Sequence, residues 1–259
     1  MSIQITTEQI KELRDQTGIS VMQCKRALEE AEGDVNKALA ILKKTSSDIA
    51  QKKGNREVKD GRVSVKTDGR KAVLVSLHCE TDFVAKNEDF TTLLDKLANE
   101  AFVNGAEKMK SSAKDMIDSI IQKTGENIVL GDVYEVSGNV LGYYIHNNKT
   151  GVIVSLEGGN PELAKDIAMH ITAMKPEYMS LQEVSEDVRK TMLEIFEKEV
   201  ANIDKPADIK KKMLDCKIAT YFKEKTLTEQ TFIKDGEITI DKLLEKNNAK
   251  IKEVKRYSI

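Results

Sequence analysis

Two strand-like segments of nearly the same sequence stand far apart in this chain. The run Val73–Leu77 (VLVSL) is matched by Val152–Leu156 (VIVSL). A turn sequence precedes each run, Asp68-Gly69 before the first and Asn147–Thr150 before the second. A segment with helical spacing of apolar residues follows each run. The repeat predicts two α+β subdomains with antiparallel sheets, related by internal duplication, although VxVSL strands are common enough to arise by chance.

The helix after the first run is predicted from apolar residues at helical spacing, which are Phe90, Leu93, Leu94, Leu97 and Ala101. The helix after the second run begins at Pro161, with Asn160 as its cap, and ends near Pro176. A last strand, residues 250 to 257, is expected to return to the second sheet. Residues 185 to 225 predict an antiparallel helical hairpin inserted before that strand, because Lys205-Pro206 interrupts two apolar helical patterns.

Residues 7 to 44 predict three short helices. In the second, Val21, Cys24, Leu28 and Ala31 form an apolar stripe, and Met22 lies off it. Residues 45 to 57 contain few apolar side chains and are interpreted as a linker. We therefore expect a three-helix domain with its linker at 1–54, a first α+β subdomain at 55–137, and a second at 138–259 that carries the hairpin.

Composition excludes several functional classes. The chain has 259 residues, with 41 basic and 43 acidic side chains, so its net charge of −2 gives no electrostatic case for direct nucleic-acid binding. No run approaches the length of a membrane span, and no signal peptide is recognisable. Three widely spaced cysteines predict reduced thiols. We expect a soluble cytoplasmic protein that does not bind membranes.

Motifs for catalysis or cofactors are absent from the sequence. It contains neither a GxxxxGK[ST] phosphate loop nor a GxGxxG turn. Its histidines, His78, His146 and His170, are not at metal-ligand spacing from another histidine or cysteine. His170 lies beside an apolar stripe and is expected to pack or hydrogen-bond there, whereas His146 precedes a turn and is a better surface candidate. We expect no enzyme activity, no cofactor and no metal site.

The stretch Thr81–Asn87 (TDFVAKN) is unusual for a corner between a strand and a helix. It contains no glycine or proline, and it places Phe83 between an acid and a valine. On one interpretation Phe83 staples the next helix to the sheet, with Asp82 or Asn87 as the helix cap. On the other, Phe83 is exposed for function, because corners on a rigid scaffold often carry it.

A resemblance favours the functional interpretation. TDFVAKN after a strand that ends in cysteine, together with LRDQTG at 13–18, MQCKRAL at 22–28 and the segment from His170 to Pro176, resembles bacterial elongation factor Ts in the family's order. That family comprises guanine-nucleotide exchange factors for elongation factor Tu. The resemblance implies a ubiquitin-associated-type domain at the N-terminus and a protruding coiled coil for the hairpin.

The resemblance also implies site residues. Thr81, Asp82, Phe83 and Val84 would press on the GTPase near its Mg²⁺, and Phe83 would wedge between partner side chains. The ion would be dislodged and the phosphate loop would lose its fit, so GDP would leave and GTP would bind. We expect a heterodimer with elongation factor Tu, or a higher complex.

Weaker contacts are implied at Arg14, Val21, Met22 and His146, the first three docking on a helix of the partner's nucleotide domain. From the residues alone, the alternative is that Val21 is a core residue, which its position on the stripe favours, and that Arg14 is a solvated charge. Longer relatives continue past the last strand into a helical segment that touches the partner, and we expect that contact to be missing in a sequence that ends at Ile259, unless the sequence has been shortened.

Two further hypotheses come from other classes. In one, the chain is a non-catalytic adaptor whose three-helix domain binds a helical or ubiquitin-like partner. In the other, it is an enzyme with a site assembled from dispersed residues, which a deep pocket with convergent polar groups would reveal.

Overall fold

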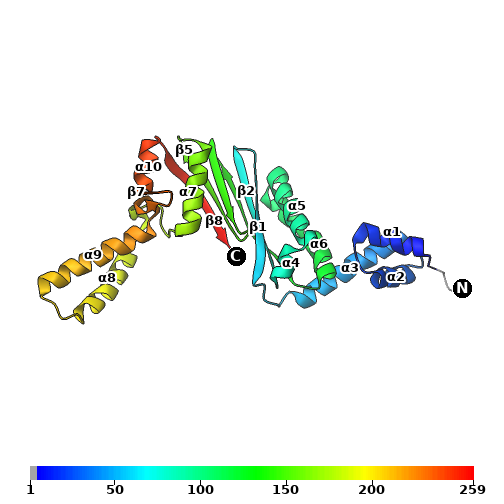
Figure 1. Ribbon diagram of the computed structural model, residues 1–259. Coiled ribbons are helices and arrows are strands. Elements are labelled where there is room, and N and C mark those ends of the chain that lie inside the picture. Colours follow the sequence, from blue (N-terminus) through cyan, green and yellow to red (C-terminus); the bar gives the residue numbers. More distant parts are fainter. Residues whose placement is uncertain (1–4) are drawn as a thin grey trace. The chain divides into compact units, whose positions relative to one another are not determined.

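The computed structural model describes residues 5–259, which form a mixed α+β fold (Figure 1). They divide into two compact units. The first contains the chain up to Val136 together with Ile145–Gly151 and Arg256–Ile259, and the second contains Ser137–Tyr144 and Val152–Lys255. The predicted α+β class is confirmed, whereas the domain boundaries at residues 54 and 137 stay predictions.

Three helices open the first unit. They are α1 (Thr7–Thr17), α2 (Val21–Glu30) and α3 (Val35–Lys53). Side-chain caps fix where they begin, because Thr6, Ser20 and Asp34 each accept a hydrogen bond from a backbone N–H in the first turn. Their small core buries Leu13, Cys24, Leu28 and Ala38 completely.

The predicted linker at 45–57 is wrong over most of its length, because α3 continues to Lys53. Contacts with α6 (Ala106–Thr124) explain the extra turns. Ser46 is buried and donates to Gln122, and Ile49 and Ala50 pack against the first α+β core. Local helix propensity is only a weak guide to structure, and here the packing against α6 keeps a polar segment helical.

The first sheet has the strand order β1-β2-β3, formed by β1 (Asp60–Thr67), β2 (Lys71–Cys79) and β3 (Ile128–Ser137). Strands β1 and β2 pair antiparallel from Asp60↔Cys79 to Thr67↔Ala72. The predicted turn joins them, with Gly69 at a φ of 89° and the Asp68 carboxylate accepting from the N–H groups of Arg70 and Lys71. The sequence analysis missed β3.

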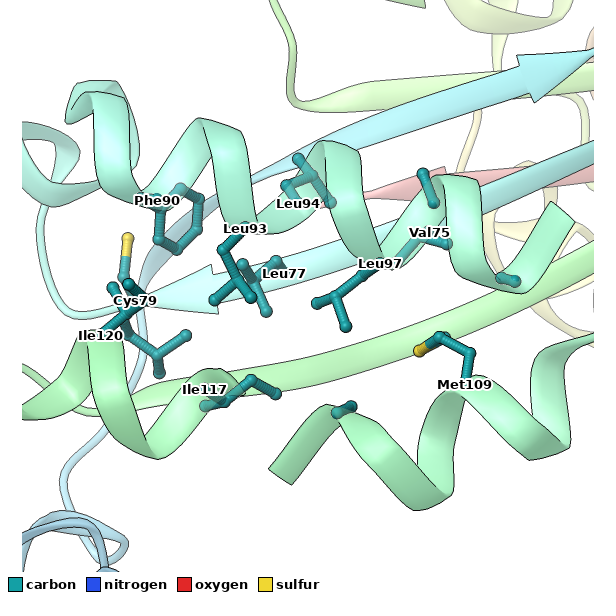
Figure 2. Close-up of a cluster of buried hydrophobic side chains, with 14 of the residues drawn as sticks. Val75, Leu77, Cys79, Phe90, Leu93, Leu94, Leu97, Met109, Ile117 and Ile120 are labelled. Carbon is teal, nitrogen blue, oxygen red and sulfur yellow. The ribbon is translucent and has the colours of Figure 1, made fainter. Parts of the chain in front are cut away.

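Helices α5 (Glu88–Asn104) and α6 cover the sheet, and α5 lies along β1 and β2 (Figure 1). The predicted α5 stripe is fully or nearly fully buried. Figure 2 shows Phe90, Leu93, Leu94 and Leu97 meeting side chains of β2 and α6. This core supports the corner at the end of β2 from below.

The second sheet has the order β4-β5-β8, formed by β4 (Val140–His146), β5 (Thr150–Glu157) and β8 (Lys250–Ser258). The return of the last strand to this sheet was predicted and is confirmed. Helix α7 (Pro161–Met174) begins at the predicted cap, Asn160, and packs on β5 through Ala164, Ile167 and Ala168.

The predicted hairpin is present as α8 (Glu186–Ala201) and α9 (Ala207–Lys225), which lie side by side (Figure 1). Between the hairpin and β8 lie β6 (Thr231–Phe232), β7 (Asp235–Thr239) and α10 (Ile240–Lys246). The β6–β7 pair was not predicted from the sequence. Across residues 5–259, the helices lack the combination of length and apolar character that crossing a membrane requires.

Candidate partner-binding site

The corner at the end of β2 contains a one-turn helix, α4 (Asp82–Lys86), followed at once by α5. Thr81 caps α4, since its hydroxyl accepts from the Val84 N–H at 3.4 Å. Asn87 caps α5, since its side chain accepts from the Asp89 N–H at 2.8 Å. Asn87 as a cap was one of the expectations; Asp82 as a cap was another, and it is wrong.

Phe83 is 82% exposed, the highest value among the exposed large hydrophobic side chains of the described residues. The interpretation of Phe83 as a staple is therefore wrong. The neighbouring residues face the core instead, because Ala85 is buried and Val84 packs against the cluster beneath α4. A helical residue one position before Val84 is rotated by about 100° and so points away from that core.

Asp82 lies in the first turn of α4, where a carboxylate is favoured by the helix dipole. Its Oδ2 accepts from Lys86 Nζ at 2.6 Å, and the Lys86 side chain is exposed while that of Asp82 is half-exposed. The surface of α4 therefore presents an aromatic ring and a carboxylate at adjacent positions.

Beneath α4, Cys79 is a buried thiol that donates to the Thr81 carbonyl at 3.1 Å. Burial, with smaller effects from the charges of Glu126 and Asp60, raises the pKa of the Cys79 thiol to about 12. A thiol held protonated in this way is a poor nucleophile, so Cys79 acts as a packing group and a donor.

Sequence reasoning missed Glu126, which lies between α6 and β3. Its Oε2 accepts from the Thr81 N–H at 3.0 Å, and its Oε1 accepts from the Thr81 hydroxyl at 2.6 Å. The two residues are 45 positions apart. No spacing motif signals such a contact, and the loop that carries Glu126 was not assigned to any element.

The other predicted residues lie on separate elements. Arg14 is in the last turn of α1 and Met22 in the first turn of α2, and both are exposed. Val21 is 45% exposed and Met22 60%, so the placement of Val21 on a buried stripe is wrong. The short joint from Gly18 to Ser20 connects the two helices, so these three residues belong to one end of the three-helix domain.

His146 is exposed at the end of β4, in a turn whose next residues, Asn147 and Asn148, have positive φ. The Asn147 side-chain nitrogen lies 3.2 Å from His146 Nε2. The Asn148 carbonyl accepts from the Val63 N–H at 2.8 Å, which ties the turn to β1.

The other two histidines form contacts within the fold, and packing or hydrogen bonding was expected for His170. His170 is fully buried, with Nδ1 accepting from the Ile233 N–H at 3.3 Å and Nε2 lying 2.9 Å from Gln230 Oε1. His78 Nε2 lies 2.7 Å from the Tyr257 hydroxyl. Within residues 5–259, no three His, Cys, Asp or Glu side chains gather in a group that could hold a metal ion.

Comparisons with known proteins show to which family this chain belongs. A family model described as elongation factor TS matches residues 80–259, more than half of the chain. The elongation factor Ts of Hahella chejuensis is 40% identical over 262 residues, covering 98% of this chain and 92% of its own length. That of Deinococcus radiodurans is 38% identical over 263 residues, covering 97% and 98%. By these matches the chain belongs to the elongation factor Ts family of translation elongation factors.

Proposed function

We propose that this protein binds elongation factor Tu in its GDP-bound state and promotes GDP release and GTP loading. A bound nucleotide in such a GTPase is held by backbone amides, a lysine and Mg²⁺ around its phosphates. An exchange factor therefore needs a rigid group that presses into this region, and no nucleophile of its own.

The observation that carries the proposal is the exposure of Phe83, at 82%, on a helix capped by Thr81 and followed directly by the capped start of α5. A large exposed aromatic on a rigid scaffold is typical of an interface anchor. Asp82 beside it places a negative charge where it can compete for the cation or its ligands. In this mechanism Phe83 separates partner side chains, Asp82 disturbs the Mg²⁺ ion, and Thr81 and Val84 complete the contact.

The thermodynamics follow from coupling. If the exchange factor weakens nucleotide binding by some factor, then nucleotide weakens binding of the exchange factor by the same factor. Incoming GTP would therefore drive the two proteins apart. We propose a cytoplasmic heterodimer as the working complex, with neither membrane nor nucleic acid in direct contact.

The test is release of a fluorescent GDP analogue from elongation factor Tu with excess unlabelled nucleotide. We expect release to accelerate with the concentration of this protein and to reach a plateau. Unchanged release at concentrations that form the complex would overturn the proposal.

A second candidate is an adaptor that binds through the three-helix domain, which the exposure of Val21 and Met22 favours. Pull-down distinguishes the two. The exchange factor should retain elongation factor Tu better without nucleotide than with GTP, whereas an adaptor should show no nucleotide dependence.

A further inference from the structure

Helix α4 is too short to hold its own shape. A helix of five residues lies far below the length at which isolated helices persist in water, because nucleation costs more than a single turn returns. Yet this turn carries Phe83 and Asp82. Something outside α4 must therefore fix its conformation.

Glu126 provides that restraint through Thr81. Its two carboxylate oxygens accept from the backbone N–H and the hydroxyl of the same residue, at 3.0 and 2.6 Å. Hydrogen bonds to a carboxylate are stronger than those between neutral groups. Because the hydroxyl hydrogen is directed at Glu126, an oxygen lone pair is left to accept from the Val84 N–H, which is the capping bond of α4. The carboxylate thus orients the cap.

The residues before and after Glu126 in the sequence are both held by hydrogen bonds. Gly125 ends α6 with a φ of 77°, and its carbonyl accepts from Lys53 at the end of α3. Asn127 is buried, donates its N–H to Glu80 at 2.6 Å, and donates its side-chain amide to the Arg56 carbonyl at 2.8 Å. The carboxylate of Glu80 also accepts from Arg56 at 3.4 Å. The loop therefore has little freedom to release Thr81.

We infer that Glu126 is a positioning residue for the exchange reaction, acting through Thr81 to keep Phe83 and Asp82 in the geometry that meets the partner. The inference rests on the proposed function of the α4 surface and adds a residue that need not touch the partner. Restricting a contact group before binding avoids the entropy cost of ordering it in the complex. Loss of Glu126 should therefore weaken exchange without unfolding the protein.

The first test compares Glu126→Gln with Glu135→Gln in the full chain. Glutamine offers one acceptor and directs its NH₂ group toward the second donor, so it cannot satisfy both Thr81 groups. Glu135, on β3 of the same unit, pairs with Lys71 at 3.1 Å, so the control makes the same Glu→Gln change elsewhere and leaves the Thr81 contacts intact. We expect the maximum exchange rate divided by the half-saturating concentration to fall about tenfold for Glu126→Gln and to stay within about twofold for the control.

Hydrogen exchange supplies a readout that general destabilisation would not produce. In free Glu126→Gln, faster amide exchange should be confined to residues 81–87, whereas a global loss of stability would also accelerate the amides of β2 and α5. Thr81→Val removes the hydroxyl that donates to Glu126, and in the free protein it should accelerate amide exchange over the same residues 81–87.

The decisive test repeats Glu126→Gln in a Phe83→Ala background. If Glu126 acts through α4, its substitution should have little further effect once Phe83 is gone, so the double variant should resemble Phe83→Ala alone. Two outcomes would overturn the inference. One is an equal loss of nucleotide exchange activity in both backgrounds. The other is normal nucleotide exchange together with normal amide protection of α4 in Glu126→Gln. Normal exchange by Phe83→Ala would instead overturn the role proposed for the α4 surface, and unchanged GDP release with the intact protein would overturn the proposed function itself, so these failures are distinguishable.

Discussion

Lys86 Nζ lies 2.6 Å from the Asp82 carboxylate, one helical turn along α4, and the two side chains are 65% and 47% exposed. An exposed pair at this spacing typically contributes about 0.3–0.5 kcal/mol. The interaction is therefore weak enough for a partner to replace. Asp82 is restrained in the free protein but remains available to a cation or to the groups that hold one.

The first prediction concerns Asp82. Asp82→Asn should lower stimulated GDP release by about three- to tenfold when free Mg²⁺ is present, the range expected for an interface charge. The loss should shrink when a chelator has already removed the ion, since no ion is then left to dislodge. The measurement is release of fluorescent GDP at matched ionic strength with and without chelator.

Lys86→Met is the matched control for Asp82→Asn, because it breaks the same ion pair and keeps the carboxylate. We expect a change in exchange of less than about twofold. Equal losses for Asp82→Asn with and without Mg²⁺ would show that Asp82 acts as an ordinary contact and not on the ion.

The second prediction separates two phenylalanines seven positions apart. Phe83 is 82% exposed and Phe90 is fully buried. Phe90→Ala should cost about 3–5 kcal/mol of folding free energy. Phe83→Ala should leave the free energy of unfolding nearly unchanged and lower exchange about tenfold or more, as expected for an aromatic anchor. Denaturant unfolding and GDP release are measured on both variants. A large stability loss in Phe83→Ala would contradict the exposed placement.

Local signals were enough to predict much of the fold. Strand-like runs after turn sequences located β2 and β5, and caps with apolar spacing located α5 and α7. Phe83 shows where local reasoning stops. The sequence TDFVAKN is compatible with a buried or an exposed ring, and the choice depends on whether the core beneath has room. In the structure Val84 and Ala85 face the core that contains Phe90 and Leu93, and the Phe83 ring is left in solvent.

Contacts between distant segments account for the other misses. The strand β3 is added to β2 after three intervening helices, and Glu126 reaches Thr81 across 45 positions. Helix α3 extends through most of the predicted linker, as far as Lys53, because α6 packs against it. Val21 fits the stripe of α2 by spacing, but it is the first residue of that helix, beyond the point where Cys24 and Leu28 enter the core.

The third prediction concerns the three-helix domain. Val21→Ala with Met22→Ala should weaken affinity for elongation factor Tu about three- to thirtyfold, within the range of one or two interface side chains. Stability should hardly change, because both residues are exposed. Cys24→Ala, in the same helix but fully buried, should instead destabilise the domain. Calorimetric titration checks affinity and thermal melting checks stability.

The structure also changes what a deletion should do. Removing residues 1 to 54 would leave the remainder folded if residues 45–57 were a linker. Because Ser46, Ile49 and Ala50 pack on α6 and the neighbouring core, we now expect that deletion to lower the melting temperature of the remainder. Unchanged affinity of the Val21, Met22 double variant would remove the domain from the proposed interface.

The fourth prediction concerns the helical hairpin. The hydrophobic cluster of the second unit contains no residue of α8 or α9. The base of the hairpin is held by backbone bonds, with the N–H groups of Glu177 and Tyr178 donating to the Lys225 carbonyl at 2.8 and 3.1 Å. Replacing residues 187–222 with a short flexible linker should therefore preserve folding and cause at most a partial loss of exchange. Aggregation or loss of cooperative melting would show that the hairpin supports the core.

The last prediction follows from His170. Burial lowers the pKa of His170 below its value of 6.5 in an unfolded chain, and the neutral ring is required because Nδ1 accepts from the Ile233 N–H. As the pH falls below about 6.5, the unfolded chain takes up a proton that the folded chain resists, so the free energy of unfolding should decrease toward acid. His78 also has a lowered pKa through burial and contributes in the same direction.

Denaturant unfolding between pH 8 and pH 5 tests the role of His170 when the intact chain is compared with His170→Gln. The variant carries no ionisable group at this position, so its stability should be lower at pH 8 and should fall less steeply below pH 6.5. The remaining slope would belong to His78 and the carboxylates. An identical pH dependence in the two proteins would mean that His170 is protonated equally easily in the folded and unfolded states, contrary to its buried position between Ile233 and Gln230.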